Sequence, residues 1–166
     1  FAEALANQDN AIVLRPELAE AHSIRGDALR GLKRFDEALV AYDEAIRFKP
    51  NLAEAWFGRG NANTNLGRLD EALLAYDRGL AIKSNLAGPW LGRANVLSGL
   101  RRLTEALAAY EKATGLKTDL AEAWAGHGNV LFQRRQFKDA LISYNKAVAL
   151  NPQLPGLRSM RLHCRM

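Results

Sequence analysis

The sequence predicts an all-α protein, an α-solenoid built from stacked antiparallel helix hairpins. Four stretches superimpose without insertion at a period of 34 residues, beginning at Ala19, Ala53, Ala87 and Ala121. Within each stretch, apolar residues recur at the three- and four-residue spacing of an amphipathic helix. Each stretch holds two such runs separated by a short break, and one pair of helices this small cannot close a core alone. Neighbouring hairpins must therefore stack against one another.

The period also predicts how the single domain, residues 1–166, is organised. Residues 1–18 match the second half of a repeat and predict the second helix of a truncated one; because the chain begins at Phe1 and not at Met, we expect upstream sequence to have been removed. Residues 155–166 predict a C-terminal capping helix, which a solenoid needs over its last apolar face. The apolar stripe of that helix comprises Leu157, Met160, Leu162 and Cys164. The four full repeats are 19–52, 53–86, 87–120 and 121–154.

Each repeat has a break between its two helices, where we expect the hairpin to turn. In the first three repeats the break contains a glycine, at Gly31, Gly67 and Gly99. In the fourth repeat it contains the polar run 133–136. Glycine and polar runs are typical of such breaks because they favour turns over helix interiors.

Composition restricts the class of protein. Of the 166 residues, 48% are apolar and 25% charged, which excludes a disordered chain, and the net charge is only +5. The sequence has neither an apolar run long enough to cross a bilayer nor a secretory signal, so we expect a cytoplasmic protein that does not bind membranes. The single cysteine, Cys164, excludes an internal disulfide and is compatible with that compartment.

Several positions of the repeat carry the same kind of residue each time, in the order large, small, alanine, tyrosine and small. On these residues the unit resembles the tetratricopeptide repeat, and the resemblance covers residues 1–154. It implies a right-handed superhelix in which small residues let helices approach and tyrosines fill the space beside them. It also implies a module that binds a protein or peptide. The residues in question are His22, Trp56, Trp90 and Trp124; Gly26, Gly60, Ala94 and Gly128; Ala38, Ala72, Ala106 and Ala140; Tyr42, Tyr76, Tyr110 and Tyr144; and Ala45, Gly79, Ala113 and Ala147.

The resemblance further implies that the first helix of each hairpin lines a concave groove, through positions 2, 5, 6, 9, 12 and 13 of the unit. Position 9 predicts a polar column of Asp27, Asn61, Asn95 and Asn129. An asparagine amide donates and accepts hydrogen bonds, which suits it to clamp the main chain of an extended peptide. The alternative is that these residues bond to the neighbouring repeat. The other expected groove residues are Glu20, Glu54, Phe57, Asn65, Leu91, Glu122 and Gln133.

One position departs from the family, where leucine is usual before the small residue. It holds Arg25, Arg59, Arg93 and His127. One interpretation is a side chain that packs between helices while its head reaches solvent or a carboxylate. The other is a buried chain of ion pairs that runs through the stack.

The remaining signals argue against other functions. Basic residues fall in the turns without interleaved aromatic residues, so we expect no nucleic-acid binding. The fragments Gly58-Arg59-Gly60 and Gly126-His127-Gly128 lie inside helices, where packing explains them better than a phosphate loop. The groove lacks the lysines of the subclass that grips chaperone C-termini. We find no pattern for a catalytic, cofactor or metal site, and expect the chain itself not to be an enzyme.

Two further hypotheses concern the whole protein. The tail Leu162-His163-Cys164-Arg165-Met166 resembles the junction at which the repeat arm of bacterial O-linked N-acetylglucosamine transferase and SPINDLY-like enzymes meets the catalytic region. The chain would then be a substrate-recognition arm, with the chemistry located beyond Met166. Alternatively, the exposed ends of the solenoid could stack on another copy, which would make the chain a self-assembling scaffold element.

Overall fold

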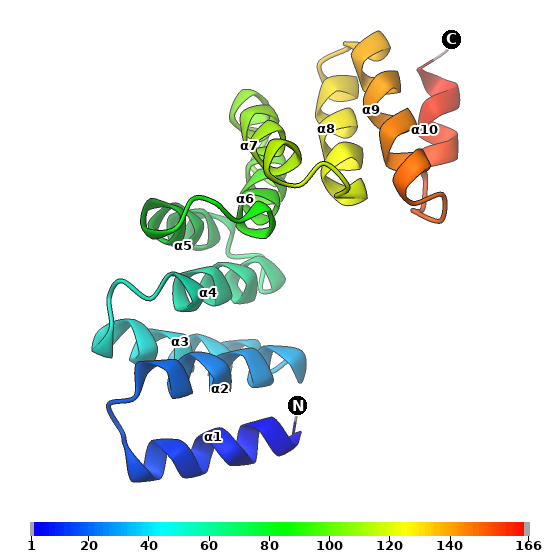
Figure 1. Cartoon of the computed structure of the whole chain (residues 1–166). Helices are drawn as coiled ribbons and strands as arrows, with labels where there is room; N and C mark the ends of the chain where they lie inside the picture. The colour runs from blue at the N-terminus through cyan, green and yellow to red at the C-terminus, as the bar shows by residue number, and fades with distance from the viewer. Residues whose placement is uncertain (1, 165–166) are drawn as a thin grey trace. The chain divides into compact units, whose positions relative to one another are not determined.

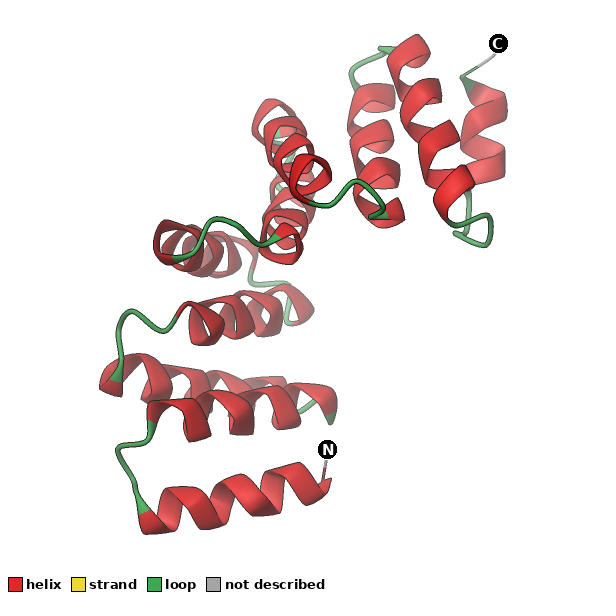
Figure 2. Cartoon of the chain, in the orientation of Figure 1, coloured by secondary structure: helices red, strands yellow, loops and turns green. Residues whose placement is uncertain are grey.

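The computed structural model describes residues 2–164, and these residues form ten helices and no strand (Figure 2). The prediction of an all-α protein made of helix hairpins is confirmed. The described residues fall into two compact units, which divide between Ser84 and Asn85. We call them unit 1 and unit 2 and describe each by itself.

Unit 1 contains two hairpins and one further helix (Figure 1). Helices α2 (Ala19–Gly31) and α3 (Phe35–Phe48) form the first hairpin, and α4 (Ala53–Asn65) and α5 (Leu69–Ile82) form the second. Helix α1 (Ala2–Leu14) lies against α2, and α4 packs on both α2 and α3. The first helices of both hairpins therefore lie side by side.

Unit 2 repeats this arrangement. Helices α6 (Ala87–Gly99) and α7 (Leu103–Leu116) form one hairpin, and α8 (Ala121–Gln133) and α9 (Phe137–Leu150) form the next. The short helix α10 (Leu157–His163) lies against α9 (Figure 1).

The tyrosine of each second helix is the centre of the packing, as Tyr42 illustrates in unit 1. Its side chain is fully buried, within a cluster that includes Leu29, Ala38 and Ala45. The ring is in contact with glycines of two hairpins: a Cβ added to Gly26 would lie 2.6 Å from its Cε1, and one added to Gly58 would lie 2.3 Å from it. The expected role of the small residues is confirmed, since any side chain there would overlap the ring.

In unit 2, contacts of the same kind explain the fragment Gly126-His127-Gly128. A Cβ on Gly126 would lie 2.4 Å from Cε1 of Tyr110 in the preceding hairpin. A Cβ on Gly128 would lie 2.8 Å from the ring of Tyr144 in its own hairpin. The two glycines therefore serve two successive tyrosines, which confirms that packing, and not phosphate binding, accounts for the fragment.

The turns of the second and fourth hairpins form within the predicted breaks, at Gly67 and in the run 133–136, but those of the first and third form just after the predicted glycines. Gly31 and Gly99 are the last residues of α2 and α6, and of the three predicted turn glycines only Gly67 has positive φ, at 73°. In the other three turns, the residue with the left-handed backbone conformation is Lys33, Arg101 or Arg135, each with φ at 61°. At the first turn, the N–H of Lys33 donates to Arg30 O at 2.9 Å and the N–H of Arg34 donates to Leu29 O at 2.9 Å. This is the Schellman pattern, which satisfies the free carbonyl groups at a helix end.

This geometry predicts opposite effects for two substitutions in unit 1. A Cβ added to Gly67 meets no atom within 4 Å, so Gly67→Ala is a test of backbone strain alone, and we expect it to destabilise unit 1 by about 1 kcal/mol. Lys33→Gly removes the same kind of strain, so we expect it to stabilise unit 1. The gain in the free energy of unfolding should be only about 0.5 kcal/mol, because glycine loses more chain entropy on folding. Urea unfolding followed by circular dichroism measures both, and a loss of stability in Lys33→Gly would contradict this account.

The large residue near the start of each first helix ties that helix to the turn before it. Trp56 Nε1 donates to Pro50 O at 2.8 Å, and Trp124 Nε1 donates to Thr118 O at 2.9 Å. His22, which stands at the tryptophan position of the first repeat, makes the equivalent contact from Nε2 to Pro16 O at 2.7 Å. Since the carbonyl accepts, His22 Nε2 carries the proton.

Helix α10 packs over the last hairpin through only part of the predicted stripe. Leu157 is buried beside Tyr144, and Met160 and Cys164 pack against the same cluster. The prediction for Leu162 is wrong, because its side chain is 62% exposed. Residues 157, 160 and 164 share one helical face, and residue 162 lies off it. Arg165 and Met166 of the predicted tail motif lie outside the described residues.

Candidate functional site

Unit 2 contains a groove of about 580 Å³ between α6, α8 and the chain that leads into α10. We call it the α8 groove. Helix α6 contributes Asn95 and Ser98, and α7 contributes Tyr110. The segment after α9 contributes Leu154, Pro155, Gly156, Leu157 and Met160.

Helix α8 supplies the main wall of the groove from a single face. Its lining residues are Glu122, Ala125, Gly126, Asn129, Phe132 and Gln133. They are separated by three, one, three, three and one positions, so they lie on one stripe of the helix. They also occupy all six positions of the repeat at which the family resemblance implies a concave face. From α6, the residues at positions 9 and 12 reach the same groove.

The polar column is held by the tyrosines. In unit 2, Tyr110 Oη donates to Asn95 Oδ1 at 2.6 Å, and Tyr144 Oη donates to Asn129 Oδ1 at 2.9 Å. In unit 1, Tyr76 makes the same bond to Asn61 at 2.6 Å. Each residue of the column therefore bonds to a tyrosine of its own hairpin, 15 positions later, and not to the neighbouring repeat.

This bond fixes what the asparagines can offer a ligand. Burial raises the pKa of Tyr110 to about 12, so its hydroxyl is a donor throughout the neutral range. With Oδ1 taken by the tyrosine, the free groups of Asn95 and Asn129 are the Nδ2 hydrogens, for which the described residues provide no partner. The column of unit 2 is thus a pair of donors. Asp27 differs, because its carboxylate accepts from Tyr42 at 2.8 Å and from Arg30 at 3.4 Å.

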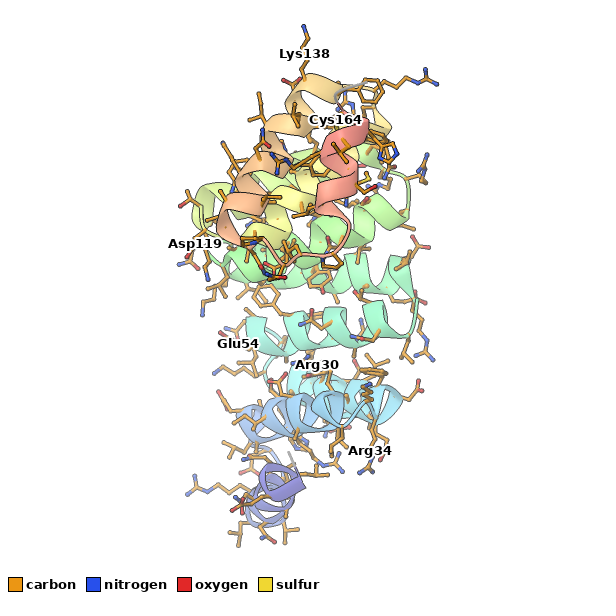
Figure 3. The ribbon with its side chains drawn as sticks, turned by 90° about the vertical axis from the view of Figure 1, so that its right-hand side faces the viewer. Arg30, Arg34, Glu54, Asp119, Lys138 and Cys164 are labelled. Carbon is orange, nitrogen blue, oxygen red and sulfur yellow. The ribbon has the colours of Figure 1, made fainter. Side chains whose placement is uncertain are left out.

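The three predicted glutamates do not share one environment. Lys49 Nζ lies 2.6 Å from Glu20 Oε1, and Lys83 Nζ lies 2.9 Å from Glu54 Oε1. These hydrogen bonds lower the pKa of both carboxyl groups. Glu54 stands at the start of α4 (Figure 3). Glu122 lines the α8 groove and has no hydrogen-bond or ion-pair partner among the described residues.

The remaining predicted groove residues are placed differently from one another. The expectation of an exposed contact at Phe57 is wrong: the residue is 7% exposed, and its Cε1 would lie 2.3 Å from a Cβ on Gly79. Leu91 is half-buried and is not among the lining residues of the α8 groove. Asn65 Nδ2 donates to Asn61 O at 2.8 Å, and Gln133 Oε1 accepts from Arg101 at 2.8 Å.

At the position that departs from the family, the arginine of the second repeat reaches an exposed carboxylate, whereas the histidine of the fourth repeat is largely buried. Arg59 Nε lies 2.7 Å from Asp43 Oδ1, with 25% of the arginine side chain and 58% of the aspartate side chain exposed. His127 Nδ1 lies 2.9 Å from Ser143 Oγ, and burial lowers the pKa of this imidazole. The interpretation of a packed stem with its head on a carboxylate is confirmed for Arg59.

Several basic residues in the turns are neutralised by nearby carboxylates. Arg34 holds Glu37 with two bonds of 2.7 and 2.6 Å, and Arg68 lies 2.9 Å from Asp36. Arg34 and Glu54 lie at opposite edges of unit 1 (Figure 3). The edges therefore carry paired charges, in keeping with solvated turns.

The sequence did not predict that the segment after α9 lines part of the α8 groove. Pro155 and Met160 lie beyond the last repeat, and Leu154 is the final residue of that repeat, which is not one of the family's groove positions. The signal was available in Pro155-Gly156, directly after the last repeat, since this pair is typical of a turn that redirects the chain. Among residues 2–164 no group of three or more His, Cys, Asp or Glu side chains could hold a metal ion. None of the described helices has the length and apolar character needed to span a bilayer.

Comparison with known families gives three matches along the chain. A TPR repeat model matches residues 26–67, and two tetratricopeptide repeat models match residues 53–86 and 91–155. No curated protein sequence matches the chain. Nothing in these comparisons supports the glycosyltransferase arm suggested by the tail.

Solved structures share the fold at low sequence identity. YrrB, a TPR protein with an unusual peptide-binding site, superimposes with a TM-score of 0.85 at 20% identity, over 95% of this chain and 81% of that chain. MamA from Desulfovibrio magneticus RS-1 gives 0.83 at 19% identity, over 93% and 88%. The Cut9–Hcn1 assembly of the APC/C gives 0.82 at 16% identity, over 98% of this chain and 32% of that one. At these identities the likeness concerns the fold alone.

Proposed function

Since this chain belongs to the tetratricopeptide repeat family, we propose that the α8 groove binds an extended peptide segment of a protein partner. Tetratricopeptide repeats are protein-interaction modules, and YrrB is described as having a peptide-binding site. The observation that carries the proposal is the pair of free amide donors on Asn95 and Asn129, each with its oxygen held by a tyrosine.

Fixed donors of this kind suit the backbone of a peptide. Helices in contact lie about 8–10 Å apart, and α6 packs against α8, so the two amides reach carbonyl groups about three residues apart in an extended chain. Because the tyrosine bonds hold both amides in place, little side-chain freedom is lost on binding. Phe132, Leu154 and Met160 then provide apolar contacts for the side chains of the peptide. We extend the proposal to Asn61 of unit 1, whose Oδ1 is held by a tyrosine in the same way. Asp27 has no amide donor, so its carboxylate could only accept a hydrogen bond from a peptide N–H.

The test begins with peptides selected by the protein itself. A display library of random nonapeptides is panned against the 166-residue chain, and the affinity of the enriched peptides is measured by fluorescence anisotropy. We expect the double variant Asn95→Ala with Asn129→Ala to weaken binding about tenfold, because each lost hydrogen bond contributes about 0.5–1.5 kcal/mol.

The matched control is Asn145→Ala, which removes an exposed asparagine of α9 outside the lining of the groove. It should bind as the parent chain does. Circular dichroism shows whether the double variant keeps its fold after two tyrosine hydroxyls lose their acceptor. A folded double variant with unchanged affinity, or a parent chain that enriches no peptide, would refute the proposal.

A further inference from the structure

We infer that the α8 groove selects peptides with a lysine or arginine, because Glu122 is the only charged residue of its lining and has no partner among the described residues. This inference rests on the proposed function and names the class of peptide that the groove takes.

The reason lies in a difference between repeats. In the first two full repeats, a lysine 29 positions after the glutamate closes an ion pair with it, from Lys49 to Glu20 and from Lys83 to Glu54. The equivalent position of the fourth repeat is Asn151. Its Oδ1 accepts from the backbone N–H of Gln153 at 3.1 Å, so this side chain holds the turn after α9. The carboxylate of Glu122 is therefore left for a ligand.

The surroundings of Glu122 favour a basic residue over a free cation or a neutral group. The other lining residues bear no charge, and they include the donors on Asn95 and Asn129 and the apolar side chains of Phe132, Leu154 and Met160. A lysine or arginine can lay its methylene stem on such an apolar wall while its head reaches the carboxylate. An acidic side chain in the same place would face Glu122 without a compensating cation.

The experiment uses the peptides enriched by the parent chain, each compared with a copy in which every lysine and arginine is replaced by glutamine. We expect basic residues to be over-represented in the enriched peptides, and the glutamine copies to bind about fivefold more weakly, the effect of an ion pair of about 1 kcal/mol. Glu122→Gln should remove that difference, and raising the salt concentration should reduce it.

Two further variants test whether the preference arises because Glu122 lacks the lysine that pairs with the glutamate in the first two full repeats. Asn151→Lys restores the lysine found at this position of the other repeats, and we expect it to remove the preference while Glu122 stays in place. Glu105→Gln deletes a carboxylate of α7 that lies outside the lining of the groove and is already neutralised by Arg102 at 2.7 Å, so it should leave the preference unchanged.

Failure of the inference is separable from failure of the proposed function. Peptides that depend on Asn95 and Asn129 but bind the parent chain and Glu122→Gln with the same preference would overturn the inference and leave the groove as a peptide site. A preference that survives in Asn151→Lys would also overturn it. Peptides that ignore the asparagines would overturn both.

Discussion

Tyr144→Ala will destabilise unit 2 by about 3–5 kcal/mol, the range for deleting a fully buried aromatic side chain. The ring is completely buried, and Leu131, Ala140, Ala147 and Leu157 surround it. Its loss leaves a cavity that Gly128 has no side chain to fill. The ring packs against residues of both the last hairpin and α10. The loss of stability should therefore extend beyond α9 to α10.

Tyr144→Phe separates the ring from its hydroxyl. This variant loses only the bond to Asn129 Oδ1 at 2.9 Å, and we expect a cost of about 1 kcal/mol. Urea unfolding gives both values, and hydrogen exchange of the α8 and α9 amides assigns them to unit 2. Equal losses in the two variants would show that the hydroxyl, and not the packing of the ring, carries the stability.

Gly58→Ala will destabilise unit 1 by about 1–3 kcal/mol, the cost of forcing an extra methyl group into a closed core. The new Cβ would lie 2.3 Å from Cε1 and 2.4 Å from Cζ of Tyr42. The ring has little room to shift, because it is fully buried and Gly26 of its own hairpin approaches it so closely that a Cβ there would lie 2.6 Å from Cε1. The hairpins α2–α3 and α4–α5 must therefore separate slightly to admit the methyl group.

The control for this prediction is Gly115→Ala in α7. A Cβ on Gly115 meets nothing within 4 Å, so only helix propensity changes, and we expect a gain of up to about 1 kcal/mol. Thermal unfolding of the two variants alongside the parent chain measures the contrast. If Gly58→Ala were as stable as the parent chain, the two hairpins could separate to admit the methyl group without any loss in the free energy of unfolding, which would contradict the prediction.

The sequence predicted the fold because the period repeats the same packing problem four times. The small residues and Tyr42 recur together, so their contact could be inferred from the repeat pattern alone. The turns could not be inferred in the same way. Gly31 and Gly67 look alike in the sequence, but the left-handed residue is set by where the helix ends, and in the first hairpin that residue is Lys33.

The site was predicted in outline but not in its chemistry. Glu122 and Asn129 were expected in a groove from their positions in the repeat, and both line one. That Tyr144 takes the oxygen of Asn129 depends on how close the two helices of one hairpin approach, which no periodicity reports. Phe57 was misplaced for a related reason: the absent side chain of Gly79 opens a space that draws the ring inward.

The tyrosine held between glycines of two hairpins also restricts how a gene for such a protein can change in length. Gly58 and Gly60 lie two positions apart and face different rings, Tyr42 and Tyr76. Losing or gaining a few codons within α4 would move a bulkier residue onto one of those rings. Duplication or loss of a whole 34-residue segment keeps every ring opposite its small residues. Evolution of this chain should therefore proceed in steps of one repeat, with shorter insertions confined to the turns.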